Sequence, residues 1–332
     1  MSNNISTYFT RSNIVESIHN IKSCVTDLNG NILLKSGNLN DVIYPRSAIK
    51  IFQAIPFIKS NSVKDYKLNS KIIALACSSH RAENYHIKEL NNWINKIGIN
   101  KNKLKCGIHN PLNEKASKKL LRLNKKANQL HNNCAGKHLA MISTCINKKY
   151  NTSNYLEFSH PHQKEIRKIF AKFTGFGIKK KNFGIDGCSA PQYSFKIKDI
   201  SKMLINLCKS YNYNFDYSTE VRSLINAITA NPSYIGGTDS LDSRIMSISK
   251  KKNFFCKGGA EGVFLFIELN KGICGVIKVI DGNERAIPSI VFNIFKKFKL
   301  MNLDELRIFK QFYDFRIVNH ANIKVGSIKT KL

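Results

Sequence analysis

Short apolar stretches near both ends of the chain predict β-strands. Residues 13–19 form one candidate strand, and residues 23–37 hold two apolar stretches separated by an Asn-Gly pair. Asn-Gly favours the positive φ angles of a tight turn, so the second segment predicts a β-hairpin. Residues 261–269 and 272–280 are apolar runs on either side of a two-residue turn and predict a second hairpin, with a last strand over residues 322–330.

The middle of the chain carries the apolar spacing that is typical of amphipathic helices. Gly175 follows one such segment as a candidate C-cap, and Ser218 opens another as a candidate N-cap. Residues 71–79 are mostly apolar, which is compatible with a buried strand or a helix. Pro56 is expected to end or kink a helix over residues 47–58. The other expected helices cover residues 114–123, 138–148, 160–173, 198–211, 218–230 and 283–299.

Strands at both ends that enclose a helical middle predict an α+β fold. In this fold one antiparallel sheet is built from both chain ends, and a helical region is inserted between them. We expect the sheet to come from residues of about 10–45 and 255–330, and the helical part from about 80–250. No internal linker is visible, so residues 1–332 are expected to form a single domain.

Composition narrows the class of protein. Hydrophobic residues make up 42% of the 332 residues, which is enough for a core and excludes a disordered chain. The N-terminal segment is polar and no apolar run is long enough to span a membrane, so we expect a cytoplasmic protein without a signal peptide. Nine scattered cysteines, an odd number, favour free thiols in a reducing compartment over a disulfide framework.

The formal net charge of +31 raises the alternative of a nucleic-acid partner. The lysines are spread along the chain rather than gathered in one arm. Lys, Asn and Ile are all abundant, and all three have codons rich in A and T. Genomic base composition therefore explains the charge as solvated surface, and no nucleic-acid partner is expected.

Ser47 and Lys50 form the first candidate for chemistry. They are three positions apart at the start of the helix expected over residues 47–58, so both side chains would share one face. The positive end of a helix dipole favours a developing alkoxide, and a desolvated lysine can act as a base. The pair is a candidate nucleophile with its base, and an ordinary surface pair is the alternative.

Two further short elements accompany this pair. CSSH at 77–80 ends an apolar run, and KGG at 257–259 lies just before the strand expected from residue 261. Their order along the chain resembles the S-x-x-K, S-D-N and K-T-G elements of the serine β-lactamases and penicillin-binding proteins.

Cysteine and histidine gather in the stretch LHNNCAGKH at 130–138. Thiolates with nearby imidazoles suit zinc. Read from spacing alone, a closed structural site could be made of four side chains: Cys106, His109, His131 and Cys134. Loop and core residues without a metal are the alternative, because a chain of this length does not need zinc to fold.

Six motifs taken together are more specific. YPRSAIKIFQAIP, CSSHRAE, CGIHNP, LHNNCAGKH, GIDGCSAP and KGGAEGVF follow one another in this order. At these separations they resemble the asparaginase II family, typified by rhizobial and fungal inducible L-asparaginases, over almost the whole chain. The resemblance implies a fold similar to that of serine β-lactamases and penicillin-binding proteins. It also implies hydrolysis of L-asparagine to aspartate and ammonia, and it is compatible with a homodimer.

The resemblance implies roles for four side chains in catalysis. Ser47 matches the family's nucleophile and Lys50 its activating lysine, while Ser79 and Lys257 match a second serine–lysine pair. Ala82 stands in CSSHRAE where the family usually has glycine, so substrate preference is less certain than reaction type.

The resemblance also implies a zinc site. Cys134, Lys137 and Cys188 match positions that hold zinc near the pocket, with water completing the set. A lysine must lose its proton before it can bind a metal. On this reading Cys106 and His109 are not ligands, which contradicts the assignment from spacing.

Four residues are candidates for binding the substrate. Asp186 matches a family residue near the site that orients substrate or a ligand. Arg46, His138 and Glu261 are candidates for the α-carboxylate and α-amino groups of asparagine.

Two rival functions remain. The first is another serine hydrolase of β-lactamase-like fold, for which an exported protein would be expected and the cysteine–lysine cluster has no role. The second is a basic, zinc-containing nucleic-acid-binding protein, which requires structural zinc at the four positions suggested by spacing.

Overall fold

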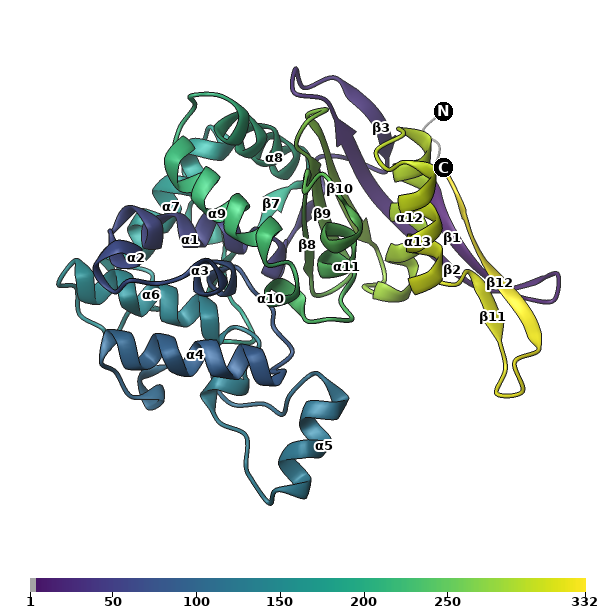
Figure 1. The fold of residues 1–332 in the computed structure, drawn as a ribbon. Coiled ribbons are helices and arrows are strands. Elements are labelled where there is room, and N and C mark those ends of the chain that lie inside the picture. The colour runs from purple at the N-terminus through teal and green to yellow at the C-terminus, as the bar shows by residue number, and fades with distance from the viewer. Residues whose placement is uncertain (1–3) are drawn as a thin grey trace. The chain divides into compact units, whose positions relative to one another are not determined.

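The computed structural model describes residues 4–332 and shows a mixed α+β architecture (Figure 1). The chain forms two compact units. The sheet unit contains the chain up to residue 48, residues 195–208 and residues 244–332, and the helical unit contains residues 49–194 and 209–243. The predicted α+β class is confirmed, and the assignment of residues 1–332 to a single domain stays a prediction.

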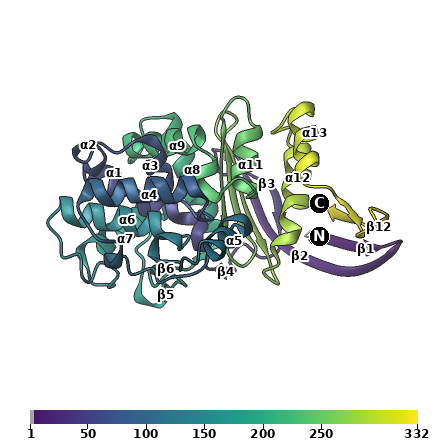
Figure 2. The same cartoon turned by 60° about the horizontal axis from the view of Figure 1, so that its bottom comes forward.

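An eight-stranded antiparallel sheet forms the centre of the sheet unit. Its strand order is β11-β12-β1-β2-β10-β9-β8, and β3 pairs with β2. The first and last strands are neighbours, with Phe9 opposite Ile328, and Figure 2 shows them side by side. The predicted sheet from both chain ends is therefore confirmed, as are both hairpins. The strands are β1 (Ile5–Arg11), β2 (Ile14–Thr26), β3 (Ile32–Ser36), β8 (Phe254–Gly259), β9 (Val263–Glu268), β10 (Ile273–Val279), β11 (Arg316–Val318) and β12 (Lys324–Lys331).

Strand β1 was not predicted, because its sequence is too polar to show an apolar pattern. The hydroxyl groups of Thr7 and Thr10 form hydrogen bonds with hydroxyl groups of β12. Thr7 Oγ1 lies 2.8 Å from Thr330 Oγ1, and Thr10 Oγ1 lies 3.1 Å from Ser327 Oγ. Cross-strand hydroxyl pairs of this kind stabilise a sheet, but only the partner strand reveals them.

Helices cover both faces of this sheet. On one face, Ser201 Oγ of α8 (Ile197–Asn212) lies 3.2 Å from Thr26 Oγ1 on β2. On the other face, Phe295 of α12 (Ile287–Lys297) packs against Phe254 and Phe266, and its ring centroid lies 5.0 Å from each of theirs. Figure 1 shows α12 beside α13 (Leu303–Phe312) along the strands. The remaining elements of this unit are β4 (Val42–Ile43), η1 (Arg46–Ile49), β7 (Phe195–Lys196), α11 (Leu241–Ile248) and η5 (Glu284–Ala286), of which α11 begins in the helical unit.

The helical unit is organised around α1 (Lys50–Lys59), which contacts α6, α7 and α9. Eight of its ten residues are buried, since its apolar residues face these helices. Trp93 of α4 is buried, stacks near Phe57 and donates to Ser143 Oγ at 3.0 Å. The other elements are α2 (Ser62–Asp65), α3 (Ser70–Ala76), α4 (Asn84–Ile97), η2 (Lys101–Lys103), α5 (Glu114–Arg122), η3 (Gln129–His131), α6 (Ala135–Asn147), α7 (Pro161–Thr174), η4 (Lys180–Asn182), β5 (Phe183–Ile185), β6 (Pro191–Tyr193), α9 (Ser218–Ala230) and α10 (Ser233–Gly236).

Four local predictions concern helices and their ends. The segment 71–79 is helical through Ala76, and Gly175 caps α7 with a φ of 85°, as predicted. Pro56 does not end α1, which continues to Lys59. Ser218 is not the N-cap of α9 but its first residue, after Tyr217. A search of residues 4–332 finds no helix that is both long and apolar enough to cross a membrane.

Candidate active site

The short helix η1 leads directly into α1, so Ser47 and Lys50 lie at a junction of two elements. Ser47 belongs to the sheet unit, and Lys50 is the first residue of α1 in the helical unit. Arg46, immediately before Ser47, has a φ of 53°. Left-handed backbone at a non-glycine residue costs free energy and concentrates at functional sites, so this conformation marks the segment as a candidate site.

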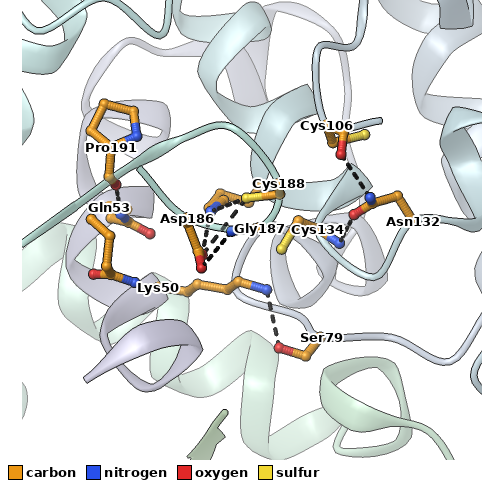
Figure 3. Close-up of polar contacts among 12 residues, drawn as sticks. Lys50, Gln53, Ser79, Cys106, Asn132, Cys134, Asp186, Gly187, Cys188 and Pro191 are labelled. Carbon is orange, nitrogen blue, oxygen red and sulfur yellow. Dashed lines mark hydrogen bonds and ion pairs between the residues drawn. The ribbon is translucent and has the colours of Figure 1, made fainter. Parts of the chain in front are cut away.

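Lys50 is buried, with 1% of its surface exposed. Its Nζ donates to Ser79 Oγ at 3.0 Å (Figure 3). It also donates to the carbonyl of Ser78. Ser79 follows the end of α3, and its backbone N–H donates to the carbonyl of Ile235 at 2.7 Å. The predicted catalytic residues Lys50 and Ser79 therefore meet, although 29 positions separate them.

Gly136 explains how α6 comes close to Ser78 and Ser79, which follow the end of α3 and are called the serine turn below. A Cβ on Gly136 would lie 2.0 Å from the carbonyl oxygen of Leu75 and 3.3 Å from Ser78 Oγ. Only glycine permits this approach of α6 to the end of α3. The glycine in CAGKH thus brings Cys134 and Lys137, on either side of it, next to the serine turn.

Cys134, Lys137, Asp186 and Cys188 form a buried cluster, called the thiol–lysine cluster below. Lys137 Nζ donates to Cys188 Sγ at 3.0 Å and lies 3.9 Å from Asp186 Oδ2. Only 3% of the Lys137 side chain and 8% of the Asp186 side chain are exposed. Figure 3 shows Asp186 and Cys188 on one loop opposite Cys134. The predicted metal residues and Asp186 are therefore neighbours.

The loop that carries Asp186 and Cys188 joins β5 to β6. The Asp186 N–H donates to the Ala190 carbonyl at 2.9 Å, and Ser189 takes a φ of 65°. Gln53, one turn after Lys50 on α1, donates to the Pro191 carbonyl at 3.5 Å. Helix α1 therefore carries Lys50 and also contacts the loop that carries Asp186 and Cys188.

The groups of this cluster shift the pKa values of one another. A hydrogen bond from Cys134, together with the nearby Lys137 ammonium, lowers the pKa of Cys188 to about 5, although burial opposes this shift. The same hydrogen bond, together with burial, raises the pKa of Cys134 to about 12. Burial disfavours the ammonium of Lys137, but Cys188, Cys134 and Asp186 raise its pKa overall. The cluster therefore holds a thiolate beside an ammonium.

The fit of this cluster to zinc follows from its donors. Thiolate sulfurs are preferred zinc ligands. The Cys134 and Cys188 side chains are hydrogen-bonded to each other, and Cys134 would have to lose its proton before both could bind the ion. Among residues 4–332, no group of three or more His, Cys, Asp or Glu side chains is placed to hold a metal. Lys137 would therefore have to complete the set after losing its proton. The residues present fit zinc on that condition.

The zinc site expected from spacing alone is wrong. His109 Nε2 accepts a hydrogen bond from the Asn133 N–H at 2.9 Å, and His131 Nδ1 accepts one from the Asn128 N–H at 3.0 Å. Cys106 Sγ donates to the carbonyl of Gln129 at 3.5 Å. These side chains hold loops in place, and sequence spacing cannot show that Nε2 of His109 and Nδ1 of His131 already accept hydrogen bonds.

His138 lies on α6, one residue after Lys137, and is fully buried. Its Nδ1 lies 2.7 Å from Tyr155 Oη, whereas its Nε2 has no hydrogen-bond partner. Burial, followed by the charge of Lys137, lowers the pKa of His138 to about 3, so the ring is neutral. Its role in binding substrate stays a prediction.

Lys257 lies on β8 in the sheet unit, 2% exposed, and its Nζ donates to the Gly258 carbonyl at 3.2 Å. A Cβ on Gly259 would lie 2.4 Å from the carbonyl oxygen of Pro45. Strand β8 therefore lies directly against the segment that carries Ser47. The glycine in KGG is required by this close contact.

Glu261 follows in the turn after β8 with a φ of 65° and is exposed. Ala82 takes a φ of 58°, in the left-handed region that favours glycine. The roles of Arg46 and Glu261 in binding substrate stay predictions.

Sequence reasoning missed Asn132, which organises the LHNNCAGKH turn. Its Nδ2 donates to the Cys106 carbonyl at 2.8 Å, and its Oδ1 accepts the Cys134 N–H at 2.9 Å. Asn132 was inside a recognised motif, and asparagine before a helix start is a usual signal for such bonds.

Comparisons with known proteins bear on this site. One solved structure, titled "Crystal structure of putative beta-lactamase from Bacteroides dorei DSM 17855", is 10% identical with a TM-score of 0.41, covering 89% of this chain and 94% of that chain. A search of curated proteins found no match. A family model described as L-asparaginase II matches residues 7–330. Because this match spans nearly the whole sequence, including every predicted site residue, the chain belongs to the L-asparaginase II family.

Proposed function

We propose that the protein hydrolyses L-asparagine to aspartate and ammonia through a serine acyl-enzyme. The observation that supports this most is the buried Lys50, whose Nζ donates to Ser79 Oγ at 3.0 Å. A lysine removed from water is easier to deprotonate than one in solvent, so it can act as a base. The family of the chain is named for this reaction.

In the proposed first step, Ser47 Oγ attacks the side-chain amide carbon of asparagine. Neutral Lys50 takes the hydroxyl proton as the new C–O bond forms. Backbone N–H groups near the start of α1 would stabilise the negative charge on the amide oxygen. This step produces a tetrahedral intermediate bound to Ser47.

In the second step the C–N bond breaks and the nitrogen receives a proton. Ser79 and Lys257 relay this proton, so that ammonia leaves and an aspartyl ester remains on Ser47. Water then adds to the ester carbon, the C–O bond to Ser47 breaks, and the proton returns to the serine. The products are aspartate and the regenerated enzyme.

Four side chains are proposed to bind the α-groups of the substrate. Arg46 would pair with the α-carboxylate, and Asp186 or Glu261 would accept hydrogen bonds from the α-ammonium group. His138 is neutral and has a free Nε2, so it would contribute a hydrogen bond without adding charge.

We also propose that Cys134, Lys137 and Cys188 hold a zinc ion. When bound, zinc would supply a fixed positive centre that organises the pocket and the α-groups of the substrate. The loop that carries Cys188 and Asp186 is contacted by α1 through Gln53 and by Lys137 through Cys188, which supports a fixed position for these donors.

The test is an ammonia-release assay on L-asparagine with the wild-type protein, Ser47→Ala and the matched control Ser117→Ala. Loss of the nucleophile is expected to lower kcat by roughly a thousandfold or more, whereas the control on α5 should keep wild-type activity. Release that survives in Ser47→Ala rejects the proposed nucleophile. Hydrolysis of a β-lactam without release from asparagine would favour the rival serine hydrolase, and a salt-dependent gel shift would favour the nucleic-acid-binding rival.

A further inference from the structure

The sheet unit contains a cavity of about 670 Å³ that holds none of the proposed catalytic residues. Three segments line it: the turn before β8, the turn between β9 and β10, and the connection from α12 to α13. Its volume is within the range of cavities that bind small molecules. The chemistry of its walls indicates which class of molecule fits.

Four lysines surround this cavity. Lys251, Lys271, Lys296 and Lys299 line it, and all four are exposed. Lys271 Nζ also donates to the carbonyl of Lys299, which ties two of the lining segments together. Four ammonium groups around one cavity repel each other in the absence of an anion and would bind phosphate groups favourably.

Two buried carboxyl groups line the same cavity. Glu268 is 1% exposed, and its oxygens accept hydrogen bonds from the Asn253 amide and the Lys271 N–H. Glu305 is 7% exposed and accepts the Asn302 N–H at 3.0 Å. A carboxylate oxygen can accept a second hydrogen bond, so these groups suit a ligand with an N–H donor. Burial raises the pKa of Glu268, as expected of a carboxyl group held away from water.

The rest of the wall is made of three asparagines, Asn253, Asn270 and Asn302, and of apolar side chains. Leu300, Met301 and Leu306 line the cavity, and each is less than 10% exposed. Methionine adapts its shape to a flat ring and makes favourable contacts with it. The ligand that fits best therefore combines an anion, an N–H donor and an apolar face.

We propose that this cavity binds a nucleoside phosphate. The lysines would hold the phosphates, the apolar wall would contact one face of the base, and a buried carboxylate would accept a hydrogen bond from its exocyclic amine. An inorganic anion would use only the lysines, and a neutral nucleoside would use only the wall and the carboxylates. A nucleotide is the simplest ligand that uses all three features.

The experiment is a calorimetric titration of the full-length protein with ADP, pyrophosphate and adenosine. ADP is expected to bind saturably and at least about tenfold more tightly than either of the other two, with affinity that falls as salt is raised. Lys296→Gln should weaken ADP binding about three- to fivefold, while Lys297→Gln, the adjacent lysine outside the cavity, should leave it unchanged.

Three outcomes would overturn the proposal. They are no saturable ADP binding at millimolar concentration, pyrophosphate that binds as tightly as ADP, and equal effects of the two lysine variants. The ammonia-release assay reports on different residues, so either proposal can fail without the other.

Discussion

The Lys50→Met variant tests the proposed base directly, because methionine keeps an unbranched side chain only one atom shorter than lysine and removes the amine. Lys50 is 1% exposed and donates to Ser79 Oγ at 3.0 Å and to the Ser78 carbonyl. Loss of general base catalysis typically lowers kcat by about a hundred- to ten-thousandfold. We expect a decrease near the middle of this range, which corresponds to roughly 4 kcal/mol in activation free energy.

The effect of this variant on stability should be small, since two contributions oppose each other. The Ser78 carbonyl loses a donor, which costs about 1–3 kcal/mol. Burial of the amine no longer has to be offset, which returns a similar amount. We therefore expect Tm to change by no more than about 5 °C in a protein of this size.

The assay combines steady-state ammonia release with thermal unfolding of the same samples. Lys59→Met is the matched control, because Lys59 is the exposed last residue of the same helix. It should keep wild-type kcat. A Lys50→Met variant that folds normally and keeps kcat within tenfold of the wild type would refute the assignment of Lys50 as the base.

Three other predictions follow from the structure. Gly136→Ala should lower the free energy of unfolding by several kcal/mol and reduce activity, because the added Cβ would lie 2.0 Å from the carbonyl oxygen of Leu75. Gly187→Ala is the control, since a Cβ at Gly187 would have no atom within 4 Å, and chemical denaturation measures both variants. Cys188→Ala should lose zinc in metal analysis of the purified protein, while Cys145→Ala, also buried but outside the thiol–lysine cluster, should retain it; equal zinc content in both would reject the metal assignment. Burial lowers the pKa of His162 to about 3. Between about pH 6.5 and pH 3 the unfolded chain therefore binds a proton at this residue that the folded chain does not. The free energy of unfolding accordingly falls as the pH decreases from about 6.5 to about 3. Compared with the wild type, His162→Leu should therefore lose less stability, by about 1.4 kcal/mol per pH unit between pH 6 and 4, as denaturant unfolding would show; the exposed His320→Leu should follow the wild type, and parallel curves for all three would contradict the reasoning.

Local patterns were sufficient for most of the fold. The hairpins at both ends and the helices of the middle follow from apolar periodicity and turn residues that act over a few positions. Strand β1 was missed because its hydroxyl pairs with Thr330 and Ser327 depend on a partner strand more than 300 positions away. Helix α1 does not end at Pro56, because packing of α1 against three helices outweighs the loss of one backbone hydrogen bond.

The candidate site was predictable as a set of residues but not as a geometry. Motifs identified Lys50, Ser79 and the thiol–lysine cluster, yet only the close approach at Gly136 explains why the serine turn and α6 meet. Spacing failed for His109 and His131, because a backbone N–H already bonds Nε2 of His109 and Nδ1 of His131. Sequence separation gives no information about such bonds.

The central claim is that Ser47 carries the acyl group, and trapping that intermediate tests it most directly. The protein would be mixed with L-asparagine, quenched in acid within the first turnover and digested for peptide mass analysis. The account predicts a mass increase of one aspartyl group on the peptide that contains Ser47, absent in Ser47→Ala. An aspartyl adduct on Ser79 instead, or turnover in Ser47→Ala with no adduct on any serine, would contradict it.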